Sequence, residues 1–199
     1  MYLLCFKVIL HGMKAQPGIS LANISLTPVP PRLLLIVIQG PDHKAITELI
    51  ARLALGGPFH LISNGHWLPD QDSLRRSVRR YTVAVNEILD HPIIGRPATC
   101  LQLRDQLEQA ERQPHPVLVL NFLHHFFDPD VDLTLRQRVL EQCCQQIKHL
   151  SLSKPVVILI QYLPIEEYQQ FFPLLCSVAD EIIETTTEPL TEISQPSLL

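Results

Sequence analysis

Eight residues, 40 to 47, carry the pattern in this chain that comes closest to a known chemistry. A phosphate-binding loop has the pattern G-x-x-x-x-G-K-[ST], in which the second glycine frees backbone N–H groups for phosphate, the lysine reaches the β- and γ-phosphates, and the hydroxyl holds Mg²⁺. Gly40 and Thr47 keep the outer positions, whereas Ala45 replaces the second glycine and Ile46 replaces the lysine. The pattern therefore indicates a phosphate loop that has lost its fixed cation.

The segments on either side of these residues are of the kind that such a loop requires. Residues 33–38 form a continuous apolar run, which is typical of a strand buried on both faces. Residues 46–54 then repeat apolar side chains at helical spacing, and Gly56 and Gly57 mark the end of that helix. We expect a strand, a tight turn and a helix in succession.

Strands and helices alternate along the rest of the chain. The apolar runs predict strands at 59–63, 117–120, 155–160 and 181–184, and the spacing of apolar residues predicts helices at 70–90, 99–112, 133–150 and 165–177. This alternation predicts an α/β fold with a mostly parallel sheet and helices on both faces. In such sheets ligands bind at the carboxyl ends of the strands.

Composition limits the kinds of protein that this chain can be. Of its 199 residues, 46% are hydrophobic, which suits one compact domain. We place this domain at 28–184. We expect an irregular lead-in at 1–27, with one edge strand at 19–26, and a disordered tail at 185–199. A net charge of −4 gives no overall attraction to nucleic acid or membrane, so nucleic-acid binding needs a local patch, and no membrane partner is expected. Five cysteines without C-x-x-C spacing predict reduced thiols in a cytoplasmic protein, or a nuclear one if the cell is eukaryotic.

The order of these elements resembles that of RecA-like recombinase cores, including the archaeal and eukaryotic recombinase paralogues, and the resemblance spans roughly residues 25–184. It places the lysine of the P-loop on Ile46, the catalytic glutamate near Asn64 and the Walker B aspartate on Asn121, while the polar sensor of the next strand is kept as Gln161. The resemblance thus implies a RecA-like P-loop fold in which three charged hydrolytic positions are neutral. Because phosphoryl transfer depends on positioning and on neutralising negative charge, we expect no catalytic residues here and no hydrolysis by this chain alone.

Four arginines in the predicted helix at 70–90 form a second candidate site. Arg75 and Arg79 are one helical turn apart, and so are Arg76 and Arg80, which makes a cationic ridge. Such a ridge can contact the backbone of a nucleic acid in a salt-sensitive, sequence-independent way. The alternative is a solvated helix face, or an interface with acidic groups of a partner.

Other polar and aromatic clusters have simpler explanations. His124 and His125 precede Asp128, Asp130 and Asp132, but the glycine and the terminal glutamate of a Ca²⁺ loop are missing. We therefore expect a turn followed by a helix cap rather than a metal site. Three phenylalanines nearby either anchor a partner or pack in the core: Phe122, Phe126 and Phe127.

Three hypotheses for function follow. The leading one is a catalytically inactive RecA-like subunit, without a cofactor, that binds and assembles with an active recombinase or ATPase in DNA recombination or repair. The second is a divergent NTPase, or a nucleotide-binding protein, that binds ATP and Mg²⁺ in a site completed by a partner's residues. The third is an unrelated α/β domain in which residues 40–47 resemble a phosphate loop by accident, and a sheet order unlike that of the recombinase core would favour it.

Overall fold

The computed structural model describes most of the chain. The described residues are 15–17, 30–38, 40, 42–64, 67–163 and 165–185. The predicted edge strand at 19–26 lies outside them, as do most of the predicted lead-in and nearly all of the predicted tail. All structural statements below concern the described residues.

Seven parallel strands form one sheet in the order β1-β7-β2-β6-β5-β3-β4. They are β1 (Ala15–Pro17), β2 (Arg32–Ile38), β3 (Phe59–Ser63), β4 (Pro92–Gly95), β5 (Val117–Leu120), β6 (Pro155–Gln161) and β7 (Glu181–Thr185). The strand that leads into residue 40, β2, lies inside the sheet, and β6 and β5 separate it from β3, the next strand along the chain. Because the first two strands are neighbours in dinucleotide-binding and flavodoxin-like sheets, this order differs from both.

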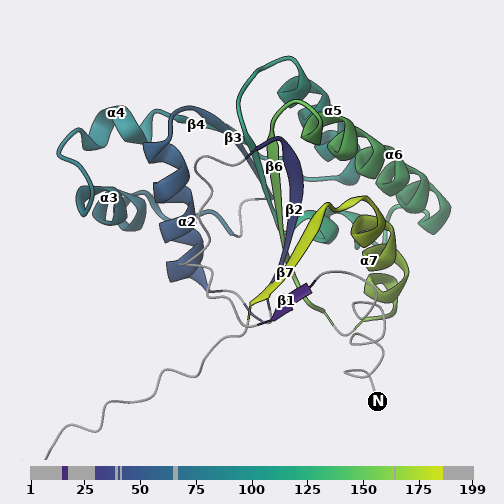
Figure 1. Cartoon of the computed structure of the whole chain (residues 1–199). Coiled ribbons are helices and arrows are strands. Elements are labelled where there is room, and N and C mark those ends of the chain that lie inside the picture. The colour runs from purple at the N-terminus through teal and green to yellow at the C-terminus, as the bar shows by residue number, and fades with distance from the viewer. Residues whose placement is uncertain are drawn as a thin grey trace, which may run out of the picture.

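Helices cover both faces of this sheet, as predicted (Figure 1). They are α2 (His43–Leu55), α3 (Gln71–Arg79), α4 (Val85–Leu89), α5 (Cys100–Glu111), the 3₁₀ helix η2 (Phe122–Phe126), α6 (Leu133–Ser151) and α7 (Glu166–Val178). Successive residues of β2 alternate between two cores: Leu35 packs on the side of α5, α6 and α7, and Ile36 packs on the side of α2. Burial on both faces explains the continuous apolar run of this strand.

Helix α2 is buried on two sides, which matters for the site. Ile46 and Ile50 pack against the sheet. Ala51, on another side of the helix, packs with Val78 of α3 and Val85 of α4. Helix α3 therefore lies against α2 rather than against the sheet, and Figure 1 shows it beyond α2. Polar residues of α2 that point toward α3 are consequently enclosed between two helices.

The predicted elements and the observed ones differ in four places, two of which are the strand β1, within the predicted irregular lead-in, and the 3₁₀ helix η2, neither of which was predicted. The prediction of a single helix over 70–90 was wrong, because α3 ends at Arg79 and α4 begins at Val85. Thr82 and Val83, both β-branched, lie in the interruption, where the Thr82 hydroxyl accepts the N–H of Ala84 at 3.1 Å and closes a turn. The short strand β4 was not predicted, because four residues are too few for a periodic pattern. The other predicted strands and helices within the described residues are confirmed.

Candidate functional site

Four of the predicted nucleotide-site positions lie along the carboxyl edge of the sheet. Strands β2 and β6 end together, because Ile38 is paired with Gln161. Strands β5 and β3 also end together, because Leu120 is paired with Ser63. The strand order therefore places the following residues along one edge in this sequence: Gly40, Gln161, Asn121 and Asn64.

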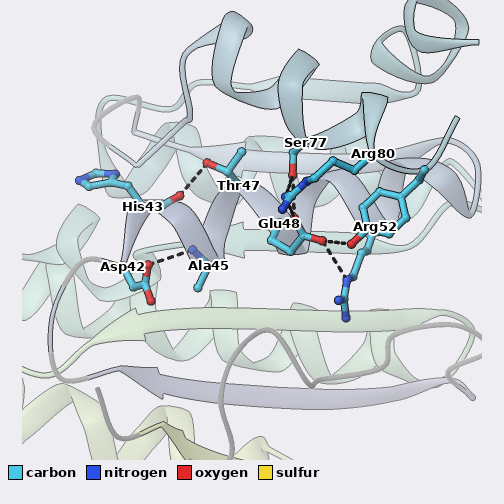
Figure 2. Close-up of polar contacts among 9 residues, drawn as sticks. Asp42, His43, Ala45, Thr47, Glu48, Arg52, Ser77 and Arg80 are labelled. Carbon is cyan, nitrogen blue, oxygen red and sulfur yellow. Dashed lines mark hydrogen bonds and ion pairs between the residues drawn. The ribbon is translucent and has the colours of Figure 1, made fainter. Parts of the chain in front are cut away.

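At the start of α2, the protein's own carboxylate binds where a P-loop would bind phosphate. Asp42 is the N-cap of the helix, and its Oδ1 accepts the N–H of Ala45 at 2.9 Å (Figure 2). The N–H groups at a helix N-terminus attract anions, and in a P-loop they hold the phosphates. Here one of those N–H groups is engaged, and the capping carboxylate repels any phosphate that approaches.

The side chains at the lysine and hydroxyl positions of the loop are both committed to the fold. Ile46 is 1% exposed and packs in the core between α2 and the sheet. The Thr47 hydroxyl donates to the carbonyl of His43 at 2.6 Å, within the helix itself (Figure 2). Gly40 has no positive φ, and a Cβ added there would meet nothing within 4 Å. The conformations of Ile46, Thr47 and Gly40 are therefore explained without a ligand.

At the neighbouring strand ends, the fold accounts for Asn121 better than it accounts for Asn64. Asn121 has a φ of 52°, in the left-handed region that asparagine tolerates better than most residues. Its backbone N–H donates to the carbonyl of Leu159 at 2.7 Å, which joins β5 to β6 at the edge. The Oδ1 atom of Asn64 is buried, and no partner for it lies within the described residues. Gln161 ends β6 and is half-buried.

A cavity of about 640 Å³ lies between α2 and α3, away from the predicted nucleotide positions except Thr47. Its lining consists of His43, Lys44, Thr47, Leu68, Pro69, Asp70, Ser73, Arg76, Ser77 and Arg80. Three of these side chains are permanently cationic and only one, Asp70, is acidic. The cavity thus concentrates positive charge in a chain that is acidic as a whole.

Glu48 is the polar centre of the contact between α2 and α3 (Figure 2). Its carboxylate, 10% exposed, accepts hydrogen bonds from the Ser77 hydroxyl at 2.7 Å, from Arg80 and from the Tyr81 hydroxyl, and it pairs with Arg52 at 3.2 Å. Burial by itself raises the pKa of Glu48, but the hydrogen bonds from Tyr81 and Ser77, the charge of Arg80 and the hydrogen bond from Arg52 outweigh it and lower the pKa below its ordinary value. Glu48 is therefore ionised at neutral pH, and it balances part of the charge of Arg80.

The four arginines of the predicted ridge do not act as one group. Arg76 and Arg80 line the cavity, whereas Arg75 and Arg79 do not. Arg75 donates to Asn86 of α4 at 2.9 Å. The ridge is thus divided into a pair that faces the cavity and a pair that does not.

Sequence reasoning missed two residues of this region. Asp42 carries a signal that could have revealed it, because an aspartate directly before an apolar helical pattern is a typical N-cap. Glu48 gives no such signal, since nothing in its local sequence indicates that a second helix covers it.

The remaining clusters have structural roles. Asp132 caps α6 by accepting the N–H groups of Thr134 and Leu135, as the predicted helix cap requires. His125 is 3% exposed, and among the described residues no group of three or more His, Cys, Asp or Glu side chains is placed to hold a metal ion. Two of the three phenylalanines, Phe122 and Phe126, are fully buried, so they pack in the core and do not anchor a partner.

Comparison of the chain with protein-family models and with curated proteins finds no match. Within the part of the chain that the structure describes, none of the helices combines the length and apolar character that crossing a bilayer requires.

Proposed function

We propose that this protein is a RecA-like subunit that does not hydrolyse nucleotide and that acts as a binding partner of an active recombinase or ATPase in DNA recombination or repair. Two features of the fold support the RecA-like part of this proposal. The strand before residue 40 lies inside a parallel sheet, and the next strand along the chain lies beyond β6 and β5. This order differs from the dinucleotide-binding and flavodoxin-like orders, in which the first two strands are neighbours.

The observation that carries the absence of hydrolysis is the hydrogen bond from Ala45 N–H to the Asp42 carboxylate. This bond places a negative charge at the helix N-terminus, where a nucleotide would need N–H groups and a lysine. The Thr47 hydroxyl donates to His43 and keeps its lone pairs, but without the lysine it offers a phosphate no positive charge. Since phosphoryl transfer depends on fixed positive charge around the phosphates, this end of α2 is unsuited to it.

A binding partner needs an exposed surface, and β4 offers one. Ile93 and Ile94 of β4 are 43% and 51% exposed. Within the described sheet β4 has β3 on one side and no strand on the other. An edge strand with exposed apolar side chains is a common place for another chain to bind. The role of the partner as a RecA-like ATPase rests on the resemblance alone.

Titration with a fluorescent ATP analogue in the presence of Mg²⁺ tests the absence of nucleotide chemistry. We expect no saturable binding and no release of phosphate by the purified chain. Saturable, Mg²⁺-dependent binding that ATP displaces would favour the alternative of a divergent NTPase completed by a partner.

Affinity purification from the native cell tests the assembly role. A tagged wild-type chain should retain a RecA-like ATPase, identified by mass spectrometry. The variant Ile93→Lys/Ile94→Lys should lose it, because two charges on an edge strand oppose the pairing of a second chain. The matched control is Leu152→Lys, which changes an isolated side chain that is 71% exposed after α6. If wild type and both variants retain no ATPase or recombination protein, the proposed pathway is wrong.

A further inference from the structure

Uncompensated positive charge in the cavity between α2 and α3 belongs to two side chains from different helices. Lys44 comes from the first turn of α2, and Arg76 comes from α3; both are exposed and line the cavity. Arg80, the third cation of the lining, is ion-paired with Glu48. Lys44 and Arg76 are therefore the cations that remain available to an anionic ligand.

The described contacts of these two cations leave them available. Lys44 makes no hydrogen bond or ion pair with any described residue, and Arg76 donates only to the neutral Ser73 hydroxyl, at 2.8 Å. The acid of the lining, Asp70, lies close enough to feel the charge of Arg76, and its Oδ1 accepts the N–H of Ser73 as the N-cap of α3. Asp70 thus has a structural task and forms no ion pair with either cation.

The chemistry of this pair suits a phosphate group. Arginine presents a planar set of N–H donors that matches phosphate oxygens, and lysine adds a mobile point charge. Tyr81 is not part of the lining, but its hydroxyl shares the Glu48 carboxylate with Arg80, which is, and the residue as a whole is 47% exposed. An exposed aromatic ring next to a cationic site allows a base to stack while its phosphate is held.

We propose that the cavity between α2 and α3 binds the phosphate backbone of single-stranded nucleic acid through Lys44 and Arg76. Arg80 and Glu48 hold α3 against α2, so the two binding cations stay on facing walls of one cavity. Arg75 and Arg79, which directly precede Arg76 and Arg80 in the sequence, take no part in this binding. This site does not depend on the identity of the protein partner, and it stands or falls separately from the proposed function.

The arginines outside the cavity provide a matched control. Lys44→Ala/Arg76→Ala and Arg75→Ala/Arg79→Ala each remove two positive charges. Because all four side chains lie on the protein surface or near it, we expect both variants to fold, and far-UV circular dichroism with thermal unfolding checks this. If binding came from general electrostatic attraction, it would weaken equally in both variants. Binding at the cavity would weaken only in Lys44→Ala/Arg76→Ala.

Fluorescence anisotropy of a labelled oligothymidylate, at low and at moderate salt, measures the binding. For Lys44→Ala/Arg76→Ala we expect affinity at low salt to fall by about tenfold or more, and the slope of log K against log salt to become shallower by about 1.4, which is roughly 0.7 for each lost phosphate contact on a single strand. For Arg75→Ala/Arg79→Ala we expect a change below about threefold, since exposed charges outside the site act only through screened solvent. Equal losses in the two variants, or no binding by the wild type, would overturn the proposal.

Competition separates a nucleic-acid site from a site for small phosphates. Unlabelled oligothymidylate should displace the labelled strand at concentrations near its own dissociation constant. Inorganic phosphate and ADP, which do not offer a chain of successive nucleotides, should compete only at far higher concentrations. If either of them competes as well as the oligonucleotide, the cavity is a site for a small phosphate and the nucleic-acid assignment is wrong.

Discussion

Replacing Glu48 with alanine tests whether the contact between α2 and α3 depends on one buried carboxylate. The carboxylate is 10% exposed and accepts hydrogen bonds from Ser77, Arg80, Tyr81 and Arg52. The substitution removes every one of these interactions at once. Its effect on the free energy of unfolding therefore measures how strongly α3 is held on α2.

The magnitude follows from how well water can replace each lost partner. Arg80 and Arg52, 58% and 43% exposed, regain water, so their ion pairs contribute at most about 1 kcal/mol each. Ser77 is 4% exposed, and a buried hydroxyl without its acceptor costs about 1–3 kcal/mol. The contact with Arg80 does not relieve that cost, because Arg80 donates to the Ser77 oxygen and cannot accept the hydroxyl hydrogen. We expect Glu48→Ala to lower the free energy of unfolding by about 2–3 kcal/mol at pH 7.

Urea unfolding followed by tryptophan fluorescence provides the assay, because the chain has one tryptophan, Trp67, which is 5% exposed and packs in the core beside α2. The matched control is Glu108→Ala, which breaks an i,i+4 pair with Arg112 between two exposed side chains and should change stability by less than about 0.5 kcal/mol. A Glu48→Ala variant as stable as the control would refute the reasoning.

The pH dependence of the same contact has a definite sign. Folding lowers the pKa of Glu48 below its ordinary value of 4.5, so the unfolded chain binds this proton more readily. The stabilisation is fully present above pH 4.5 and is lost as the pH falls through the lowered pKa. The difference in stability between wild type and Glu48→Gln should therefore shrink on acidification below pH 4.5, and a difference that stays constant would contradict the assignment.

Three further substitutions test other parts of the fold and site. Burial, and then the charge of His124, lowers the pKa of His125 from 6.5 to about 4, so the unfolded chain binds the proton more readily between these pH values. Between pH 7 and pH 5 the free energy of unfolding of the wild type should therefore fall by about 2 kcal/mol more than that of His125→Leu. Urea unfolding at the two pH values measures this difference. Lys154→Met removes hydrogen bonds from Nζ to three backbone carbonyls at the end of α5 and should cost about 2 kcal/mol, measured by thermal unfolding. Ile46→Lys restores the lysine of a P-loop but places a charge in the core, so it should lower the free energy of unfolding by about 3 kcal/mol or more. It should also yield no binding of ATP with Mg²⁺. Binding by this variant would show that the lysine alone was missing.

Much of the fold was predictable because β2 and its parallel neighbours are buried on both faces. Their side chains must then be apolar without interruption, and a run such as 33–38 is hard to mistake. The helix after β2 was predictable from the same physics, since Ile46 and Ile50 repeat at helical spacing on the face that meets the sheet. The resemblance placed Ile46 at the lysine position of a phosphate loop, whereas the structure buries it in the core.

The cavity was not predictable, because Lys44 and Arg76 meet only after α3 packs against α2. The buried apolar part of that packing is small: Ala51, Val78 and Val85 form it, and Leu74, Ile88 and Leu89 pack against them. None of these residues stands out in the sequence, and the interruption between α3 and α4 hides the helical period. The ridge of arginines was visible in the sequence, but which of them face α2 depends on the rotation of a short helix.

The distribution of charge over α2 separates the two surfaces on which a phosphate might bind. At the carboxyl edge of the sheet, Gln161, Asn121 and Asn64 are neutral, and the N-cap of α2 is the Asp42 carboxylate. Across the same first turn, Lys44 faces the cavity that it shares with Arg76. A unit charge about 5 Å from a phosphate changes its energy by about 3 kcal/mol at an effective dielectric constant near 20, unfavourably beside the carboxylate and favourably beside each cation. The carboxylate disfavours a phosphate at the sheet edge and the cations favour one in the cavity, so the two surfaces differ by several kcal/mol in favour of the cavity. A loss of nucleotide chemistry at the sheet edge is therefore compatible with phosphate binding on the outer side of α2.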